Sequence, residues 1–366
     1  MGIPDIVIEF SKKAVTAIQS GALGIVGIIL KDDKNHGAMV LKGVDEIPTG
    51  DSAFSTANTA HIERAFLGTP SKVIVYTMPK DASEYTEAFK YFATQKVHYL
   101  VGAPDISEAE ATAMATWIKG IRKNTIRRPV AVLPNTVGDN RAVVNFAVVN
   151  VSDTDKIEVG DAEYTVAEYC SRIAGLLAGL DLKVSATFKP LSEVTSIPSA
   201  SEDEVNEAVD AGKLVLYNDG ERIVIARGVN SLTTVTEADT EDLKKIKISA
   251  IQDLIETDIY STINSSYIGN YSNSYDNKCL LITAIKGYLR GLEATEGGKG
   301  YLKANSSTCE INVARQKQYL ESIGVDTSEM DEQAIKEANT GSHVFLKGTI
   351  GILDAIEDVE IFINKE

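Results

Sequence analysis

The feature that most constrains the fold is an alternation of short apolar runs and amphipathic segments between residues 72 and 180. Short apolar runs predict buried strands, whereas amphipathic segments predict helices. The expected strands are Lys72–Thr77, Val97–Val101, Pro129–Pro134 and Asn145–Asn150, and the expected helices are Ser83–Thr94, a segment opened by Ser107, and Tyr164–Leu180. Strands that alternate with helices build a mostly parallel sheet with helices on its faces. We therefore expect an α/β (α+β) fold with a helix-flanked mixed sheet.

The helix after Ser107 has the clearest local signal. Ser107 and Glu110 have the spacing of a capping box, in which each side chain bonds the backbone N–H of the other residue. Met114 and Ile118 then follow at helical spacing, which predicts a helix with one buried face.

The second half of the chain predicts a hairpin, then long helices, then closing strands. The hairpin joins Leu214–Tyr217 to Arg222–Ala226 through an Asp-Gly turn. The expected helices are Glu241–Asn264, Asp276–Ala294 and Cys309–Ile323, and the expected closing strands are His343–Ile350 and Val359–Ile363. At the other end of the chain, Ile3–Phe10 is a further expected strand.

Composition narrows the class of protein. The 366 residues suggest two or three domains, and 44% hydrophobic residues suffice for a buried core. A net charge of −16 disfavours direct binding of nucleic acid, which needs clustered cations. Residues 151–240 hold 17 acidic and 7 basic side chains, which indicates a solvated outer surface. We expect no membrane insertion and synthesis in a cytoplasm, because apolar runs are short and Asp5 and Glu9 interrupt any signal-peptide pattern.

Residue types that carry chemistry are scattered. The odd number and wide spacing of Cys170, Cys279 and Cys309 favour reduced, inert thiols. The four histidines form no pair at ligand spacing, so we expect no metal site.

Catalytic and cofactor motifs are missing. The region 70–150 contains no dinucleotide or P-loop glycine pattern, and the chain has no nucleophile elbow. Glu296–Gly300 resembles a phosphate loop but follows a helix, so we interpret it as a flexible loop.

Asp253 and Asp258 lie about 140° apart on one helix, which favours two solvated or interfacial acids over an acid/base pair. The helix of Trp117 suggests core packing for this residue. We expect no catalytic residue and no cofactor.

One stretch, Lys213–Lys278, resembles a known family. Its matching pieces are the hairpin exit Ala226-Arg227-Gly228-Val229-Asn230-Ser231-Leu232, the helix start Lys244-Lys245-Ile246, Asp253 and Asp258, and the helix exit Tyr267-Ile268-Gly269-Asn270. Together with Gly2-Ile3-Pro4-Asp5-Ile6, they resemble the tail sheath proteins of contractile phages and R-type bacteriocins, especially the compact sheaths of Gram-positive hosts. The resemblance covers residues 210–366 and the first ten, and it is weak between 30 and 200.

The resemblance implies a domain organisation and a function. It implies an N-terminal strand and arm (1–20), a variable outward-facing α/β region (21–210), a tube-facing sheath core domain (211–350) and a C-terminal linker and strand (351–366). The function it implies is a structural subunit that polymerises around an inner tail tube and contracts to drive the tube through a cell envelope. The implied partners are further copies in a helix or stacked rings, the tube, the baseplate and the tail terminator. The implied location is a virion tail or a phage-tail-like particle.

The resemblance also implies which residues make these contacts. The expected strands shared with neighbouring subunits contain Ile3, Asp5, Ile6, Val7, Ile8 and Phe10 at one end and Val359, Ile361 and Ile363 at the other. Strand addition supplies main-chain hydrogen bonds without a large side-chain interface. Ser11–Ser20 and Gly351–Glu357 would be the hinges. The alternative is that both ends complete the subunit's own sheet.

A basic stripe is the expected tube-facing surface. Lys278, Lys286 and Arg290 recur at spacings of eight and four on the helix Asp276–Ala294, and they could face an acidic tube. The alternative is an ordinary solvated helix face. For the protein as a whole, the competing functions are an α/β hydrolase-type enzyme and another tail component of the tube or baseplate.

Overall fold

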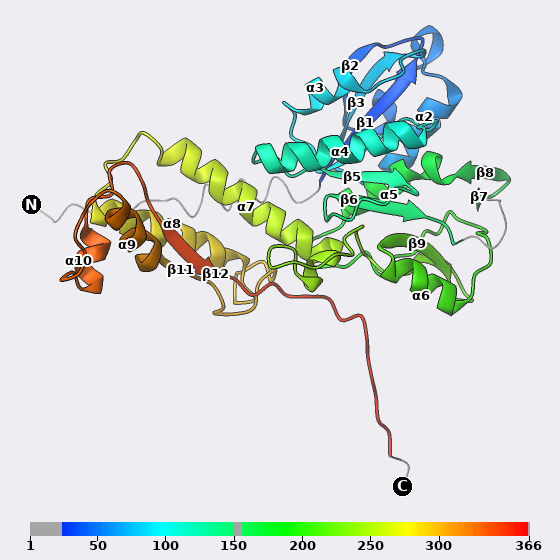
Figure 1. Ribbon diagram of the computed structural model, residues 1–366. Helices are drawn as coiled ribbons and strands as arrows, with labels where there is room; N and C mark the ends of the chain where they lie inside the picture. Colours follow the sequence, from blue (N-terminus) through cyan, green and yellow to red (C-terminus); the bar gives the residue numbers. More distant parts are fainter. Residues whose placement is uncertain (1–23, 150–155, 365–366) are drawn as a thin grey trace, which may run out of the picture. The chain divides into compact units, whose positions relative to one another are not determined.

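A computed structural model describes residues 24–149 and 156–364 of the chain (Figure 1). The expected N-terminal strand Ile3–Phe10 and the segment Ser11–Ser20 lie outside these residues. The described chain divides into two compact units, one of residues 24–253 (without 150–155) with 355–364, and one of Leu254–Asp354. We call them the large unit and the small unit and describe each by itself.

The large unit is built on a mixed sheet of eight strands in the order β10-β9-β6-β5-β4-β1-β3-β2. The strands are β1 (Ile25–Asp32), β2 (Gly37–Leu41), β3 (Lys72–Pro79), β4 (Tyr99–Val101), β5 (Val130–Pro134), β6 (Val143–Ala147), β9 (Lys213–Asn218) and β10 (Ile223–Ile225). All neighbours from β3 across to β9 run parallel, and the strands at the two edges, β2 and β10, are antiparallel to their partners. The predicted helix-flanked mixed sheet is confirmed.

Helices cover both faces of this sheet because its central strands are apolar on both sides. On one face α2 (Thr56–Phe66) and α5 (Val166–Gly179) pack on Val26, Ile28 and Phe146. On the other face α3 (Thr86–Phe92) and α4 (Glu108–Asn124) pack on Ile29 and Leu133. Further along, α6 (Glu202–Asp210) packs on Ala147 and Val215. Figure 1 shows α4 beside β5, on which it packs.

The contact between α2 and α5 depends on a glycine. A Cβ built on Gly175 would lie 1.9 Å from the carbonyl oxygen of Ala65, so only glycine lets the two helices approach this closely. This close approach seats α5 against the sheet.

Three helices of the large unit begin with a capping box. The capping box predicted for Ser107 and Glu110 is present, with the Ser107 hydroxyl accepting from the Glu110 N–H. Thr165 with Glu168 and Ser201 with Glu204 start α5 and α6 in the same way. A separate two-stranded sheet, β7 (Lys156–Val159) with β8 (Ala162–Thr165), precedes α5.

The predicted hairpin is confirmed as β9 and β10, which pair antiparallel across the Asp219-Gly220 turn. The long helix expected after it is divided. A short 3₁₀ turn, η3 (Glu241–Lys244), has Lys245 as its C-cap, and α7 (Ile246–Ser266) begins five residues after the predicted start at Glu241. Gly269 at φ +77° follows the end of α7, a conformation that favours glycine.

The small unit contains the later part of α7, α8 (Tyr275–Leu292), α9 (Val313–Ser322), α10 (Glu332–Glu337) and the two-stranded antiparallel sheet of β11 (Thr308–Ile311) with β12 (Leu346–Thr349). The Asn273 side chain donates to Thr340 and to the carbonyl oxygens of Gly341 and His343, which ties the α7–α8 turn to the chain before β12. Tyr288 on α8 donates to Asp258 on α7 at 2.9 Å.

The helix expected over Cys309–Ile323 is wrong in its first part. Thr308–Ile311 forms β11, and the helix begins only at Val313, where the Asn312 side chain accepts the Arg315 N–H. The side chains alternate between exposed and buried over Thr308–Ile311, which is the period of a strand.

Candidate assembly sites

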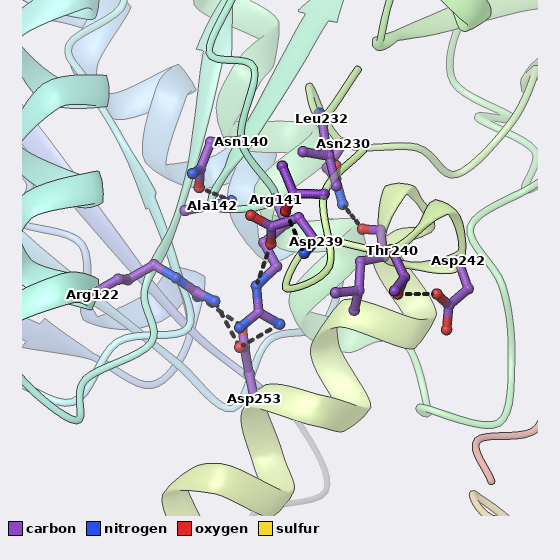
Figure 2. A network of polar contacts seen from close by, with 12 residues as sticks. Arg122, Asn140, Arg141, Ala142, Asn230, Leu232, Asp239, Thr240, Asp242 and Asp253 are labelled. Atoms are coloured by element: carbon purple, nitrogen blue, oxygen red, sulfur yellow. Dashed lines mark hydrogen bonds and ion pairs between the residues drawn. The ribbon is translucent and has the colours of Figure 1, made fainter. Parts of the chain in front are cut away.

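The start of α7 is held in the large unit by a buried carboxylate. Asp253 receives a bidentate pair of hydrogen bonds from Arg122, with both N–O distances at 2.7 Å (Figure 2). The Arg122 and Asp253 side chains are only 8% and 10% exposed. Arg141 approaches the same carboxylate at 3.6 Å and also lies 3.9 Å from Asp239. The network joins the end of α4, the β5–β6 loop and α7.

Sequence reasoning missed this network. The predicted solvated or interfacial setting of Asp253 is wrong, because Asp253 is buried in an ion-pair network of the large unit. One signal was available, because Asp253 stands seven residues after Ile246 and between Ile251 and Ile255, all of which are buried. Its arginine partner lies 131 residues away, so no local spacing could identify it.

Polar side chains of the hairpin exit Ala226–Leu232 make buried hydrogen bonds within the large unit. Asn230 is buried, and its side chain donates to the Leu243 carbonyl oxygen and accepts the Leu232 N–H. Ser231 bonds the Asn140 carbonyl oxygen at 3.0 Å. These contacts fasten the chain between β10 and α7 to the loop before β6.

The C-terminal segment is the most exposed apolar stretch of the described chain. Val359, Ile361, Phe362 and Ile363 are between 70% and 86% exposed. Residues 358–364 form no strand in the described structure, so the segment Val359–Ile363, expected as a strand, pairs with no strand among residues 24–149 and 156–364. We call residues 359–364 the C-terminal arm (Figure 1). Burying such a stretch requires contact with something else.

One side chain before the arm points into the large unit. The Glu357 side chain is 5% exposed, whereas its neighbours Ile356 and Asp358 are 90% and 78% exposed. One carboxylate oxygen, Oε1, accepts hydrogen bonds from the hydroxyls of Ser185 and Thr187, both at 2.7 Å. The other, Oε2, lies 3.4 Å from Lys245 Nζ and 3.9 Å from Arg227.

Asp358 adds a second contact at the same place. It accepts a hydrogen bond from Arg227, and this bond, with the charge of Arg227, holds the pKa of Asp358 below its usual range. The predicted linker Gly351–Glu357 therefore has fixed contacts. Gly351 and Leu353 bond the backbone of Lys303 and Tyr301, and Glu357 is held by side chains.

Comparison with known proteins connects these features to a family. Residues 80–231 match the profile of the phage tail sheath protein central domain, and residues 238–364 match the phage tail sheath C-terminal domain. The chain is 37% identical, over 98% of both sequences, to the tail sheath protein of Clostridium phage phiCD119. It belongs to the phage tail sheath protein family.

Solved structures share the fold. The sheath tail protein of Desulfitobacterium hafniense aligns with a TM-score of 0.68 at 14% identity, covering 80% of this chain and 91% of that one. A chain of the anti-feeding prophage baseplate aligns with a TM-score of 0.65 at 12% identity, covering 94% of both chains. These structures show the fold, and membership of the sheath family makes the protein a structural subunit of a tail sheath and a component of a virion tail.

The sheath family is not an enzyme family, and the displaced pKa values of this chain have structural causes. Burial lowers the pKa of His98 to about 4, and its ring Nδ1 accepts the Ile25 N–H at 2.9 Å. Burial raises the pKa of the Cys170 thiol. Cys170, Cys279 and Cys309 are all free, and residues 24–149 and 156–364 contain no group of side chains that could hold a metal ion. No helix among these residues is long and apolar enough to span a membrane.

The basic stripe on α8 is divided in this sheath subunit. Lys278 is only 2% exposed, burial lowers the pKa of its ammonium, and Nζ lies 3.5 Å from the Ala338 carbonyl oxygen. Lys286 is half-buried and Arg290 is exposed. Two of the three predicted tube-facing cations are therefore accessible on the surface of the small unit.

Trp117 has the predicted packing role. It is partly buried against the core beneath α3 and α4, and it stacks on Phe89 with ring centroids 4.7 Å apart. The loop Glu296–Gly300 lies between α8 and Leu302, so it does not join a strand to a helix as a phosphate loop does.

Proposed function

We propose that this subunit polymerises around an inner tail tube and contracts to drive the tube through a cell envelope. Copies assemble in the host cytoplasm as a helix or as stacked rings, between a baseplate and a tail terminator. In a phage, the same stroke would precede genome ejection, and in an R-type bacteriocin it would perforate the target. Better contacts in the contracted state, and not nucleotide hydrolysis, supply the energy.

The observation that carries this proposal is the C-terminal arm. It holds four exposed apolar side chains and has no sheet partner in the part of the chain that the structure describes, yet its base is held by the contacts of Glu357. An extended apolar segment of this kind is suited to strand addition on another copy, where its backbone groups gain hydrogen bonds. Five such bonds at about 1 kcal/mol each would contribute roughly 5 kcal/mol per strand.

The small unit offers a sheet that could accept a strand. β11 and β12 form a sheet of two strands in the described structure, so the outer edge of each strand has no ladder partner there. Three of the four residues of β12 are exposed. Addition of arms from neighbouring copies would extend this sheet and protect its edges. The residues Ile3–Phe10 would contribute the second shared strand.

Electron microscopy of the concentrated full-length protein tests this function. We expect hollow ribbed tubes or short helical stacks, because strand addition links each copy to the next. A population that remains monomeric at every concentration would contradict the proposal. Tubes of one smooth layer would favour a tube protein, and rings without stacking would favour a baseplate component.

The tube-facing surface is a second part of the proposal, and we place it at Lys286 and Arg290 on α8. Although the chain carries a net charge of −16, these two accessible cations on one helix would complement an acidic tube. Reversal of both charges, Lys286→Glu with Arg290→Glu, should prevent assembly of extended sheath on purified tubes. Lys317→Glu, on the 45% exposed Lys317 of α9, is the matched control. Normal extended assembly by the double variant would rule out this surface.

A further inference from the structure

The base of the C-terminal arm lies in a socket assembled from three separate segments of the large unit. Ser185 and Thr187 follow α5, Arg227 follows β10, and Lys245 precedes α7. Two hydroxyls and two cations thus converge on one carboxylate, that of Glu357. The two hydroxyl bonds to the carboxylate are charge-assisted and therefore stronger than neutral hydrogen bonds, and Lys245 and Arg227 add ion-pair contacts to its other oxygen.

The backbone around the socket is held in its shape. The Thr187 hydroxyl also accepts the Gly228 N–H at 3.0 Å, and a Cβ built on Gly228 would lie 3.1 Å from the Cβ of Ala186. Phe188, the next residue, has φ +55°, an uncommon conformation for an aromatic residue. A strained conformation persists only where its surroundings enforce it, and the Phe188 N–H is bonded to the Ile225 carbonyl oxygen at 2.8 Å. The socket is therefore a built feature of the large unit.

The alternation of the chain explains what the socket does to the arm. Successive side chains of an extended segment point to opposite sides, so fixing Glu357 inward turns Ile356 and Asp358 outward. Asp358 is then within reach of Arg227, which contacts both acids. The contacts of Glu357 and Asp358 together fix where the arm leaves the large unit and the direction in which the chain continues to Val359.

We propose that Glu357 is the positioning residue of the C-terminal arm, and that its socket of Ser185, Thr187, Arg227 and Lys245 stays occupied while the arm pairs with another copy. The second half of this inference rests on the proposed sheath assembly. The flexible part of the chain end would then be the residues after Asp358, and not the predicted hinge Gly351–Glu357. The fixed base reduces the conformational freedom that the arm must lose on pairing.

A spin label on the arm tests the anchor in the monomer. A nitroxide attached at Val359→Cys, in a Cys279→Ser background, reports how freely the arm base rotates. Glu357→Gln keeps the size of the side chain but removes its charge, and we expect label motion at least twofold faster. Lys245→Met removes a cation of the socket and should also make the label move faster. Lys244→Met is the matched control, since Lys244 pairs instead with the exposed Glu241.

Polymerisation of the unlabelled variants tests the role in assembly. We expect the concentration needed for polymer formation to rise about tenfold for Glu357→Gln and to stay unchanged for Lys244→Met. Unchanged label motion in both Glu357→Gln and Lys245→Met would overturn the anchor. Faster motion with normal polymerisation would overturn its role in positioning the arm. The wild-type chain could fail to polymerise while the label motion responds as expected. That result would contradict the proposed polymerisation but would still support Glu357 as the anchor of the arm.

Discussion

Removal of residues 359–366 should leave a folded subunit that cannot polymerise. The truncation deletes the exposed apolar arm but keeps Glu357, its socket and Asp358, so the large unit loses no described buried contact. We expect the melting temperature to change by no more than about 2 °C, since exposed residues contribute little to stability. Polymers should be absent at concentrations where the wild-type chain assembles, as measured by sedimentation and electron microscopy.

Point variants test which side of the arm is buried when the arm pairs with another copy. Ile361→Asp places a charge on the side shared with Val359 and Ile363, which strand addition would bury in the partner sheet. Glu360→Gln, on the opposite side, is the control of similar size and should assemble. Truncated protein that polymerises normally would show that the arm is dispensable. Truncated protein that unfolds would show that the arm belongs to the subunit's own core, and removal of Met1–Phe10 can be judged by the same two measurements.

Loss of the Asp253 carboxylate should destabilise the large unit by about 3–5 kcal/mol, the usual cost of removing one partner of a buried ion pair. Asp253→Asn would leave Arg122, which is 8% exposed, without the negative charge that it pairs with, while the cation of Arg141 would remain close by. Urea unfolding followed by the fluorescence of Trp117 is a suitable measurement. Trp117 is the only tryptophan, and it lies on α4, the helix that carries Arg122.

Two further variants make the Asp253 prediction specific. Glu87→Gln removes the exposed pair with Lys90, whose two side chains are 69% and 67% exposed, and should change stability by less than about 1 kcal/mol. The double change Arg122→Met with Asp253→Leu replaces the pair by apolar groups and should recover most of the loss. Equal effects of Asp253→Asn and Glu87→Gln would show that the network does not hold α7 in place.

Several parts of this protein could be predicted from the sequence because their causes are local. The period of apolar residues predicted the strands β3 to β6 and the helices α3, α4 and α5 of the large unit, but not β1, β2, α2 or α6, and the spacing of Ser107 and Glu110 located the start of α4. The Asp-Gly turn predicted the hairpin of β9 and β10. Motif resemblance was sufficient for the family, because a set of short pieces in fixed order is specific even where each piece is weak.

Other parts were decided only by the tertiary structure, because their causes lie in residues far apart in the chain. Asp253 and Glu357 are ordinary acids by sequence, yet each is buried against cations or hydroxyls more than 100 residues away. Lys278 belongs to a basic stripe by helical spacing, but packing in the small unit buries it and leaves Lys286 and Arg290 accessible. A linear pattern specifies which face of an element is apolar, whereas the burial of a single charge depends on what the fold brings against it.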